Sequence, residues 1–72
     1  MFYQKYLIYL CDDTTVEVYE PYELPWEKSL FRTYEKCKDN GAIRATLRDG
    51  TELCVLKKNI KYLRMTSVEK VF

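Results

Sequence analysis

The sequence contains no histidine, and its only two glycines, Gly41 and Gly50, stand at positions typical of turns. Without histidine the chain lacks the side chain whose ordinary pKa lies near neutral pH, and without a glycine-rich run it lacks a phosphate-binding loop. No serine or cysteine lies within a nucleophile motif. We therefore expect a protein that is not an enzyme and has no catalytic residues.

Close cysteine pairs are also absent, because the three cysteines, Cys11, Cys37 and Cys54, are widely spaced and form no CxxC pair. A structural zinc site usually needs four cysteine or histidine ligands with at least one close pair, so the sequence predicts no metal and no cofactor. Each cysteine lies within an apolar pattern, where a free thiol behaves as a small hydrophobic side chain. We expect three buried, reduced thiols, as in a cytoplasmic protein.

Long hydrophobic runs are absent, because no apolar stretch approaches the roughly 20 residues that a membrane-spanning helix requires. The amino terminus also lacks the sequence of a secretory signal, a basic region followed by an apolar stretch and a cleavage site of small residues. A soluble cytoplasmic protein without membrane contact is expected. The 72 residues predict one domain, residues 1–72, of a size at which self-association often adds stability.

The first 21 residues read as a β-hairpin. Residues 2–11 are apolar on both alternating faces, which predicts a central strand, and residues 15–20 alternate cleanly between valine and polar or aromatic side chains. Residues 12–14, Asp-Asp-Thr, favour a turn over a catalytic pair of carboxylates. Pro21 lacks a backbone donor, so it is expected to end the second strand or to confine it to a sheet edge.

From Pro25 the hydrophobic period changes to that of a helix. The predicted buried stripe consists of Trp26, Leu30, Tyr34 and Cys37. Pro25 suits the first helical position, and the pair at residues 40–41, Asn-Gly, suits a left-handed cap after the last turn.

The last 30 residues favour strands again. Residues 43–48 alternate, residues 49–50, Asp-Gly, predict a two-residue hairpin turn, and residues 51–57 form the return strand. A turn at residues 58–59 leads into a fifth strand over residues 60–65. Thr66 and Glu69 then resemble a capping box, with Val68, Val71 and Phe72 on one helical face, and fraying is the alternative.

The element order ββαβββ predicts an α+β fold, in which one helix packs on one face of a small antiparallel sheet of four to five strands. The alternative is a small, partly open β-barrel with one helix.

Charge is distributed unevenly along the chain. Six acids and no base lie between Asp12 and Glu27, interleaved with aromatic residues, although the net charge of the whole chain is only +1. This segment is open to three interpretations. It is a solvated edge strand, or an acidic and aromatic surface that binds another protein. The third is self-association, in which the acidic patch of one copy meets the basic patch of another or edge strands pair. The expected partner-binding residues are Glu17, Tyr19, Glu20, Tyr22 and Glu23. Trp26 is a further candidate anchor, in conflict with its predicted burial.

Basic residues gather at the other end, since residues 41–72 carry seven bases and three acids, a net charge of +4. With exposed tyrosines, a basic sheet face could bind nucleic acid by neutralising phosphates and stacking bases. The candidate residues are Arg44, Arg48, Lys57, Lys58, Lys61 and Arg64. A pI near 7.6 is low for such a protein, so nucleic-acid binding is the alternative function.

The combination of small size, seven tyrosines, balanced charge and missing catalytic groups resembles the accessory and inhibitor proteins of phages and mobile elements. That resemblance is one of composition. The sequence therefore predicts a small interaction protein that acts by occupying a partner's surface.

Overall fold

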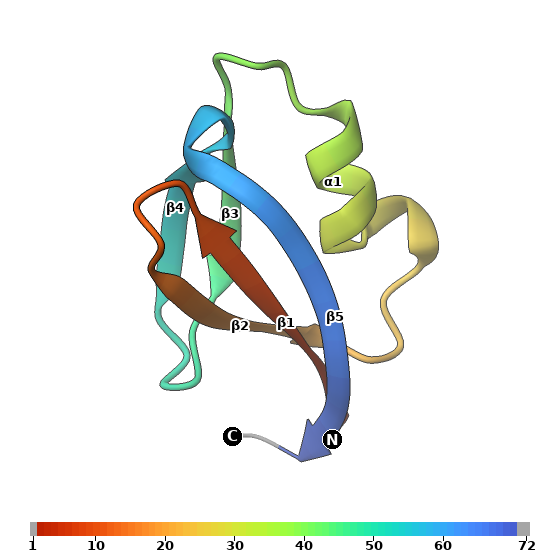
Figure 1. Cartoon of the computed structure of the whole chain (residues 1–72). Coiled ribbons are helices and arrows are strands. Elements are labelled where there is room, and N and C mark those ends of the chain that lie inside the picture. Colours follow the sequence, from red (N-terminus) through yellow and green to blue (C-terminus); the bar gives the residue numbers. More distant parts are fainter. Residues whose placement is uncertain (1, 71–72) are drawn as a thin grey trace.

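The computed structural model describes residues 2–70. Five strands form one antiparallel sheet in the order β4-β3-β2-β1-β5, and among these residues one α-helix, α1 (Leu30–Lys36), packs against the sheet (Figure 1). The strands are β1 (Phe2–Leu10), β2 (Thr15–Pro21), β3 (Ala42–Thr46), β4 (Glu52–Leu56) and β5 (Ile60–Lys70). The predicted α+β class and element order are confirmed, and the sheet does not close into a barrel.

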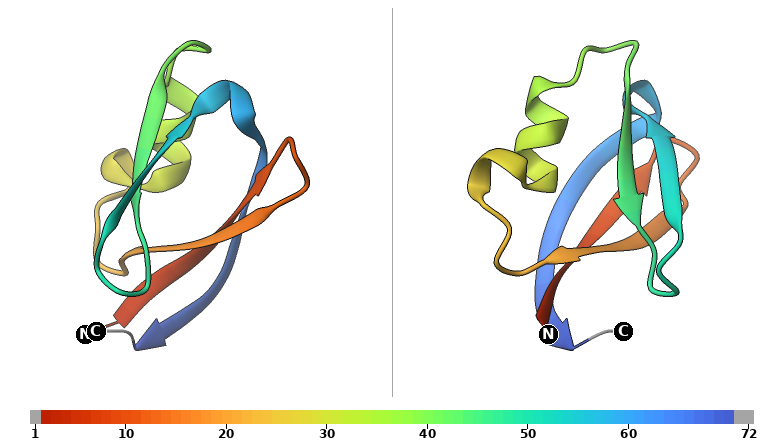
Figure 2. Two further views of the ribbon diagram at one scale, coloured as in Figure 1. Left: turned by 90° about the vertical axis from the view of Figure 1, so that its left-hand side faces the viewer. Right: turned by 180° about the vertical axis from the view of Figure 1, so that it is seen from behind.

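The core lies on the concave side of the curled sheet, where α1 covers it (Figure 2). Tyr6 and Ile8 of β1 point to this side, and the antiparallel register pairs them with Val18 and Val16 of β2. Burying large side chains on neighbouring strands and on the helix is the main source of stability in so small a chain. The fully or nearly buried apolar cluster consists of Tyr6, Ile8, Val18, Leu30, Ile43, Val55 and Ile60.

The two β-hairpin loops share one design. In each loop an aspartate, Asp12 or Asp49, accepts hydrogen bonds from the backbone N–H and the hydroxyl of the threonine two residues later, at 2.6–3.1 Å. The residue between them, Asp13 or Gly50, has a positive φ of 69° or 89°. The Asp49-Gly50 turn is confirmed, but its loop is one residue longer than predicted, because Leu47 pairs with Thr51 and Gly50 donates to the Leu47 carbonyl.

The helix begins later and ends earlier than its hydrophobic period predicts. Residues Trp26–Lys28 form a separate 3-10 helix, η1, and Ser29 then takes an extended conformation and caps α1 by accepting from Arg32 N–H. Pro25 therefore precedes η1 instead of opening an α-helix, and Trp26, predicted to be buried, is 56% exposed. A break at Ser29 rotates Trp26 off the buried stripe.

At the other end, Cys37 is already extended and ends α1. The amino group of Lys57 stabilises this end by donating to the Cys37 carbonyl over 2.5 Å, because the last carbonyls of a helix lack partners within the helix. The predicted left-handed cap at Gly41 is wrong, since Gly50 is the one glycine with a positive φ in the part of the chain that the structure describes.

One interpretation of Pro21 and of the acidic segment predicted that β2 is an edge strand, and this prediction is wrong. β2 lies between β1 and β3, although its ladder with β3 consists of a single pair, Tyr19 with Thr46. Pro21 does end the strand. The sheet edges are β4 and β5 instead.

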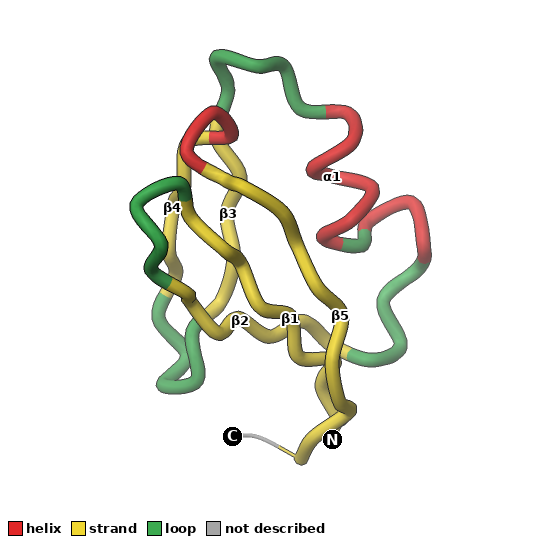
Figure 3. The backbone as a smooth tube through the Cα atoms, viewed as in Figure 1, coloured by secondary structure: helices red, strands yellow, loops and turns green. Residues whose placement is uncertain are grey.

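β5 continues well beyond its predicted end at Met65, as the unbroken strand of Figure 3 shows. Thr66 and Glu69 therefore form no capping box, and Val68 belongs to a strand; the predicted contribution of Val71 and Phe72 lies outside the described residues. The strand contains a bulge, because Gln4 pairs with Val68 while Tyr6 pairs with Met65. The buried amide of Gln4 holds this bulge by donating to the carbonyls of Thr66 and Ser67, each at 3.2 Å.

A second 3-10 helix, η2 (Lys57–Asn59), forms the predicted turn into β5. No helix within residues 2–70 is long and apolar enough to cross a membrane.

Candidate protein-binding site

Large apolar side chains are exposed together at one end of the concave side of the sheet. Single exposed apolar residues are normal on a protein surface, but contiguous ones mark surfaces that contact a partner. The exposed fractions are 58% for Phe2, 59% for Tyr22, 56% for Trp26, 45% for Met65 and 43% for Val68. We call this set of five residues the apolar groove.

Strand pairing brings these residues together from three parts of the chain. The β1–β5 register pairs Met65 with Tyr6 and Val68 with Gln4, so both β5 side chains lie on the concave side. Tyr22 follows β2 and is fixed beside the first strand, because its N–H donates to the Phe2 carbonyl over 3.0 Å. Trp26 comes from η1.

Four of these five residues line two hollows of the surface, Tyr22 lines both hollows, and Val68 lines neither. The larger, of about 470 Å³, lies between Tyr22, Trp26 and Met65, above Gln4 and Tyr6. The smaller, of about 270 Å³, lies between Phe2, Tyr22 and Glu23. Volumes of this size accept several apolar side chains of a partner.

The groove is acidic. The carboxylates of Glu20 and Glu23 line the two hollows, and no lysine or arginine lines either of them. Glu27 follows Trp26 and is exposed. Neither Glu23 nor Glu27 has an ion-pair partner among the residues that the structure describes. A partner segment that carries lysine or arginine therefore fits this site better than an acidic one.

Glu20 also has a structural role. Its Oε2 accepts a hydrogen bond from the Tyr6 hydroxyl at 2.5 Å, and its Oε1 accepts from the backbone N–H of Leu30 at 2.9 Å. Burial raises the pKa of the Tyr6 hydroxyl far above its ordinary value of 10.0, and the hydrogen bond to Glu20 and the charge of Glu20 raise it further. The carboxylate thus joins β1, β2 and the first residue of α1.

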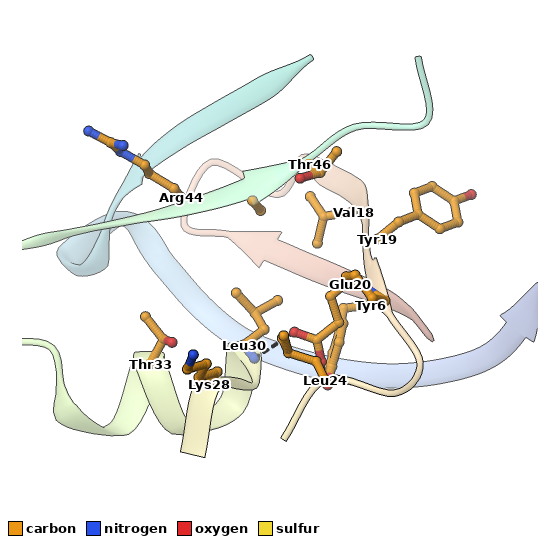
Figure 4. A pocket seen from close by; sticks show the side chains of 12 residues that line it. Tyr6, Val18, Tyr19, Glu20, Leu24, Lys28, Leu30, Thr33, Arg44 and Thr46 are labelled. Carbon is orange, nitrogen blue, oxygen red and sulfur yellow. Dashed lines mark hydrogen bonds between the residues drawn. The ribbon is translucent and has the colours of Figure 1, made fainter. Parts of the chain in front are cut away.

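A third hollow, of about 210 Å³, lies on the other side of Glu20, between the end of β2, β3 and α1 (Figure 4). Its floor is apolar, with Val18 and Leu30, and the hydrogen bond from Leu30 to Glu20 runs along it. Arg44 extends away from Glu20 in Figure 4, and Lys28 is a second base that lines this hollow.

The structure divides the five predicted partner-binding residues. Tyr22 and Glu23 are exposed and line the groove, whereas Tyr19, predicted to be exposed, is only 3% exposed. The Tyr19 side chain points to the convex side of the sheet, where its hydroxyl accepts from Arg48 over 3.3 Å. Glu20 is half-buried instead of freely exposed, and Glu17 is exposed but forms an ion pair with Lys5 at 3.1 Å.

Three of the six predicted nucleic-acid-binding residues contact their own chain. Arg48 forms an ion pair with Glu69 at 3.7 Å, and Lys61 forms one with Asp13 at 2.8 Å. Lys57 binds the end of α1, with its amino group 4.9 Å from the ring centre of Tyr34. The other three, Arg44, Lys58 and Arg64, are exposed on β3, η2 and β5. Nucleic-acid binding stays a prediction.

The thiols are less buried than expected. Cys11 and Cys54 are exposed and Cys37 is half-buried, so the expectation of three core thiols is wrong. Cys54 pairs with Arg44 across β3 and β4, and both side chains point away from the core face that Ile43 and Val55 share. Residues 2–70 contain no cluster of three potential metal ligands.

Sequence reasoning found Tyr22, Trp26 and Glu23 but missed Phe2, Met65 and Val68. The sequence pattern predicts strands without a surface role for Phe2 and Met65, and a short helix for Val68. Their exposure follows from the long β5 strand and its bulge, which pair Met65 with Tyr6, Val68 with Gln4 and Phe2 with Lys70, residues far apart in the sequence. No pattern among neighbouring residues of the sequence predicts this exposure.

Comparisons with protein-family models, with curated proteins and with solved structures find no match to this chain. Its function therefore has to be inferred from its own geometry.

Proposed function

We propose that this chain is a small, non-enzymatic protein-interaction domain that binds a partner protein through the apolar groove. The observation that supports this proposal is the joint exposure of Tyr22 and Trp26 around one acidic hollow. Tryptophan and tyrosine are the residues that most often dominate the energetics of protein interfaces. An accessory or inhibitor role, in which the chain occupies a partner's surface, follows from this mode of action.

The acids of the groove select the partner. Glu20 and Glu23 lower the electrostatic potential where the apolar anchors are exposed, so a partner with basic residues beside its apolar side chains associates faster and in a fixed orientation. The proposed surface is a refined form of the acidic and aromatic surface predicted from the sequence. It keeps Tyr22 and Glu23 as binding residues, whereas Tyr19 is buried and has a structural role.

The test compares the wild-type chain with the double variant Tyr22→Ala/Trp26→Ala in a pull-down from the native host, followed by binding measurements with each purified partner. We expect the double variant to bind at least about 10-fold more weakly, since truncation of an anchor typically costs more than 1 kcal/mol. The matched control is Leu56→Ala, which removes an apolar side chain that is 45% exposed on β4, outside the groove.

Circular dichroism and urea unfolding establish that both variants fold. Unchanged affinity of the double variant for every partner would contradict the proposal, and so would an equal loss in Leu56→Ala.

A further inference from the structure

β5 leaves a long edge of the sheet open beside the apolar groove. It is the last strand in the sheet order, pairs with β1 alone, and has 11 residues, against five in β4 at the opposite edge. Proteins usually shorten or cover their edge strands, because the unpaired N–H and C=O groups accept a further strand. Within residues 2–70, no strand covers the outer edge of β5.

The groove opens along this edge. In Figure 1 and in the right-hand view of Figure 2, the segment between β2 and α1 lies on the side of β5 away from β1, and the left-hand view of Figure 2 places it on the face of the sheet that α1 covers. Met65 belongs to β5 itself and lines the larger hollow with Tyr22 and Trp26, and Val68 lies on the same face of β5. A chain that lies against the outer edge of β5 therefore places every second side chain in the groove.

We propose that the partner binds as an extended segment that adds a strand to the free edge of β5 and inserts alternate apolar side chains into the apolar groove. This inference rests on the proposed function and specifies how the partner binds. Strand addition of this kind takes affinity from main-chain hydrogen bonds and specificity from the pockets that receive alternate side chains.

The bulge limits the length of the new ladder. Between its two register shifts, β5 is regular only over Tyr62–Met65, and every second residue of an edge strand directs its N–H and C=O outward. Few main-chain hydrogen bonds are therefore available, so the anchors in the groove have to contribute much of the affinity.

Charge defines the sequence of the segment. On the groove side the partner meets Glu20 and Glu23, which favours lysine or arginine next to its apolar residues. On the convex side it passes Arg64, which is exposed and has no ion-pair partner within residues 2–70, and this favours an acid on the alternate positions. A second copy of β5 fits poorly, because Ile60–Lys70 carries three bases and one acid.

The experiment uses a short synthetic peptide that alternates apolar or basic residues with glutamate, together with a scrambled peptide of equal composition. A third peptide carries N-methyl groups on the amides that would face β5. Trp26 is the sole tryptophan and is 56% exposed, so its fluorescence reports entry into the groove. Amide NMR shifts of Tyr62–Met65 report strand addition directly.

We expect the alternating peptide to shift Trp26 emission to the blue and to bind at least about 10-fold more tightly than the scrambled one. The N-methylated peptide should lose this binding. The variant Arg64→Glu should bind the alternating peptide more weakly than the wild-type chain does, and it should bind more tightly a peptide in which lysine replaces the glutamates.

Equal binding of the N-methylated peptide would overturn strand addition while leaving the groove as the binding surface. Failure of the alternating peptide to exceed the scrambled one would also overturn it, and the pull-down with Tyr22→Ala/Trp26→Ala tests the proposed function separately. Sedimentation of the free chain as a dimer with protected β5 amides would assign the edge to a second copy and refute the partner segment.

Discussion

The hydroxyl of Tyr6 donates a 2.5 Å hydrogen bond to Glu20, whose other carboxylate oxygen accepts from the backbone N–H of Leu30. One side chain of β2 thereby fixes a core tyrosine of β1 and supplies a partner to the first residue of α1. The same carboxylate lines the apolar groove, so the network that holds the helix also shapes the proposed binding surface.

The first prediction concerns the energetic coupling of Tyr6 and Glu20. Tyr6→Phe keeps the buried ring but removes the donor, and we expect it to lower the free energy of unfolding by about 1.5–3 kcal/mol, the range for hydrogen bonds to charged groups. Glu20→Ala should cost more, because it also removes the acceptor for Leu30. In urea unfolding the double variant should be less destabilised than the sum of the two single variants; additive effects would show that the pair is not coupled.

The second prediction concerns alkaline pH. The pKa of Tyr6 is raised above 10.0 in the folded chain, chiefly by burial and also by Glu20, so the folded state retains the phenol proton where the unfolded state releases it. The contribution of this proton to the free energy of unfolding is complete below pH 10. It declines as the pH rises further, by up to about 1.4 kcal/mol per pH unit for this one group.

Urea unfolding at several pH values from 9 upward measures this slope. In Tyr6→Phe the free energy of unfolding should fall less steeply with pH, because the variant lacks the one proton that Tyr6 retains in the folded state. Parallel curves for the two proteins would show that Tyr6 ionises equally in the folded and unfolded states.

Much of the fold could be predicted from local sequence. The two-sided apolar pattern of residues 2–11 predicted the interior strand β1. The turn residues at 12–14, Asp-Asp-Thr, and at 49–50, Asp-Gly, predicted both hairpin loops, because turn chemistry depends on neighbouring residues. The errors involve contacts distant in sequence. The helix begins after Ser29, where Glu20 reaches Leu30 across ten residues, and hydrophobic period alone does not report that contact.

The candidate site was predictable only in part, for the same reason. Tyr19 alternates with Val18, which predicts a solvated side chain, but Tyr19 is 3% exposed and its hydroxyl accepts a hydrogen bond from Arg48 of the β3–β4 loop. Phe2, Met65 and Val68 reach the groove through the β1–β5 ladder and its bulge, which Gln4 holds from the opposite end of the chain.

The third prediction uses the matched hairpin loops. Gly50 has a φ of 89°, so Gly50→Ala should destabilise the chain by about 1 kcal/mol, because an L-residue pays for the left-handed conformation. At the equivalent position Asp13 has a φ of 69°, and Asp13→Gly should stabilise the chain by about 0.5–1 kcal/mol.

Asp13→Gly also removes the ion pair with Lys61, in which the Asp13 side chain is 84% exposed. Such an exposed pair is worth little, and salt screens it. Thermal unfolding in moderate salt, with Lys61→Ala as the control for the ion pair, separates the two effects. Destabilisation by Asp13→Gly in excess of that in Lys61→Ala would contradict the backbone argument.

The last prediction separates Trp26 from the core. The hydrophobic period of residues 26–37 assigns Trp26 and Leu30 to the same buried stripe, whereas the structure leaves Trp26 56% exposed and Leu30 only 6% exposed. Trp26→Ala should therefore change the free energy of unfolding by no more than about 0.5 kcal/mol, as surface substitutions do. Leu30→Ala should cost about 2–5 kcal/mol, because it leaves a cavity in the core. Denaturant unfolding followed by circular dichroism measures both, since this signal does not depend on tryptophan. A large loss in Trp26→Ala would mean that the indole packs in the core, and Trp26 would then be unavailable as an anchor for a partner.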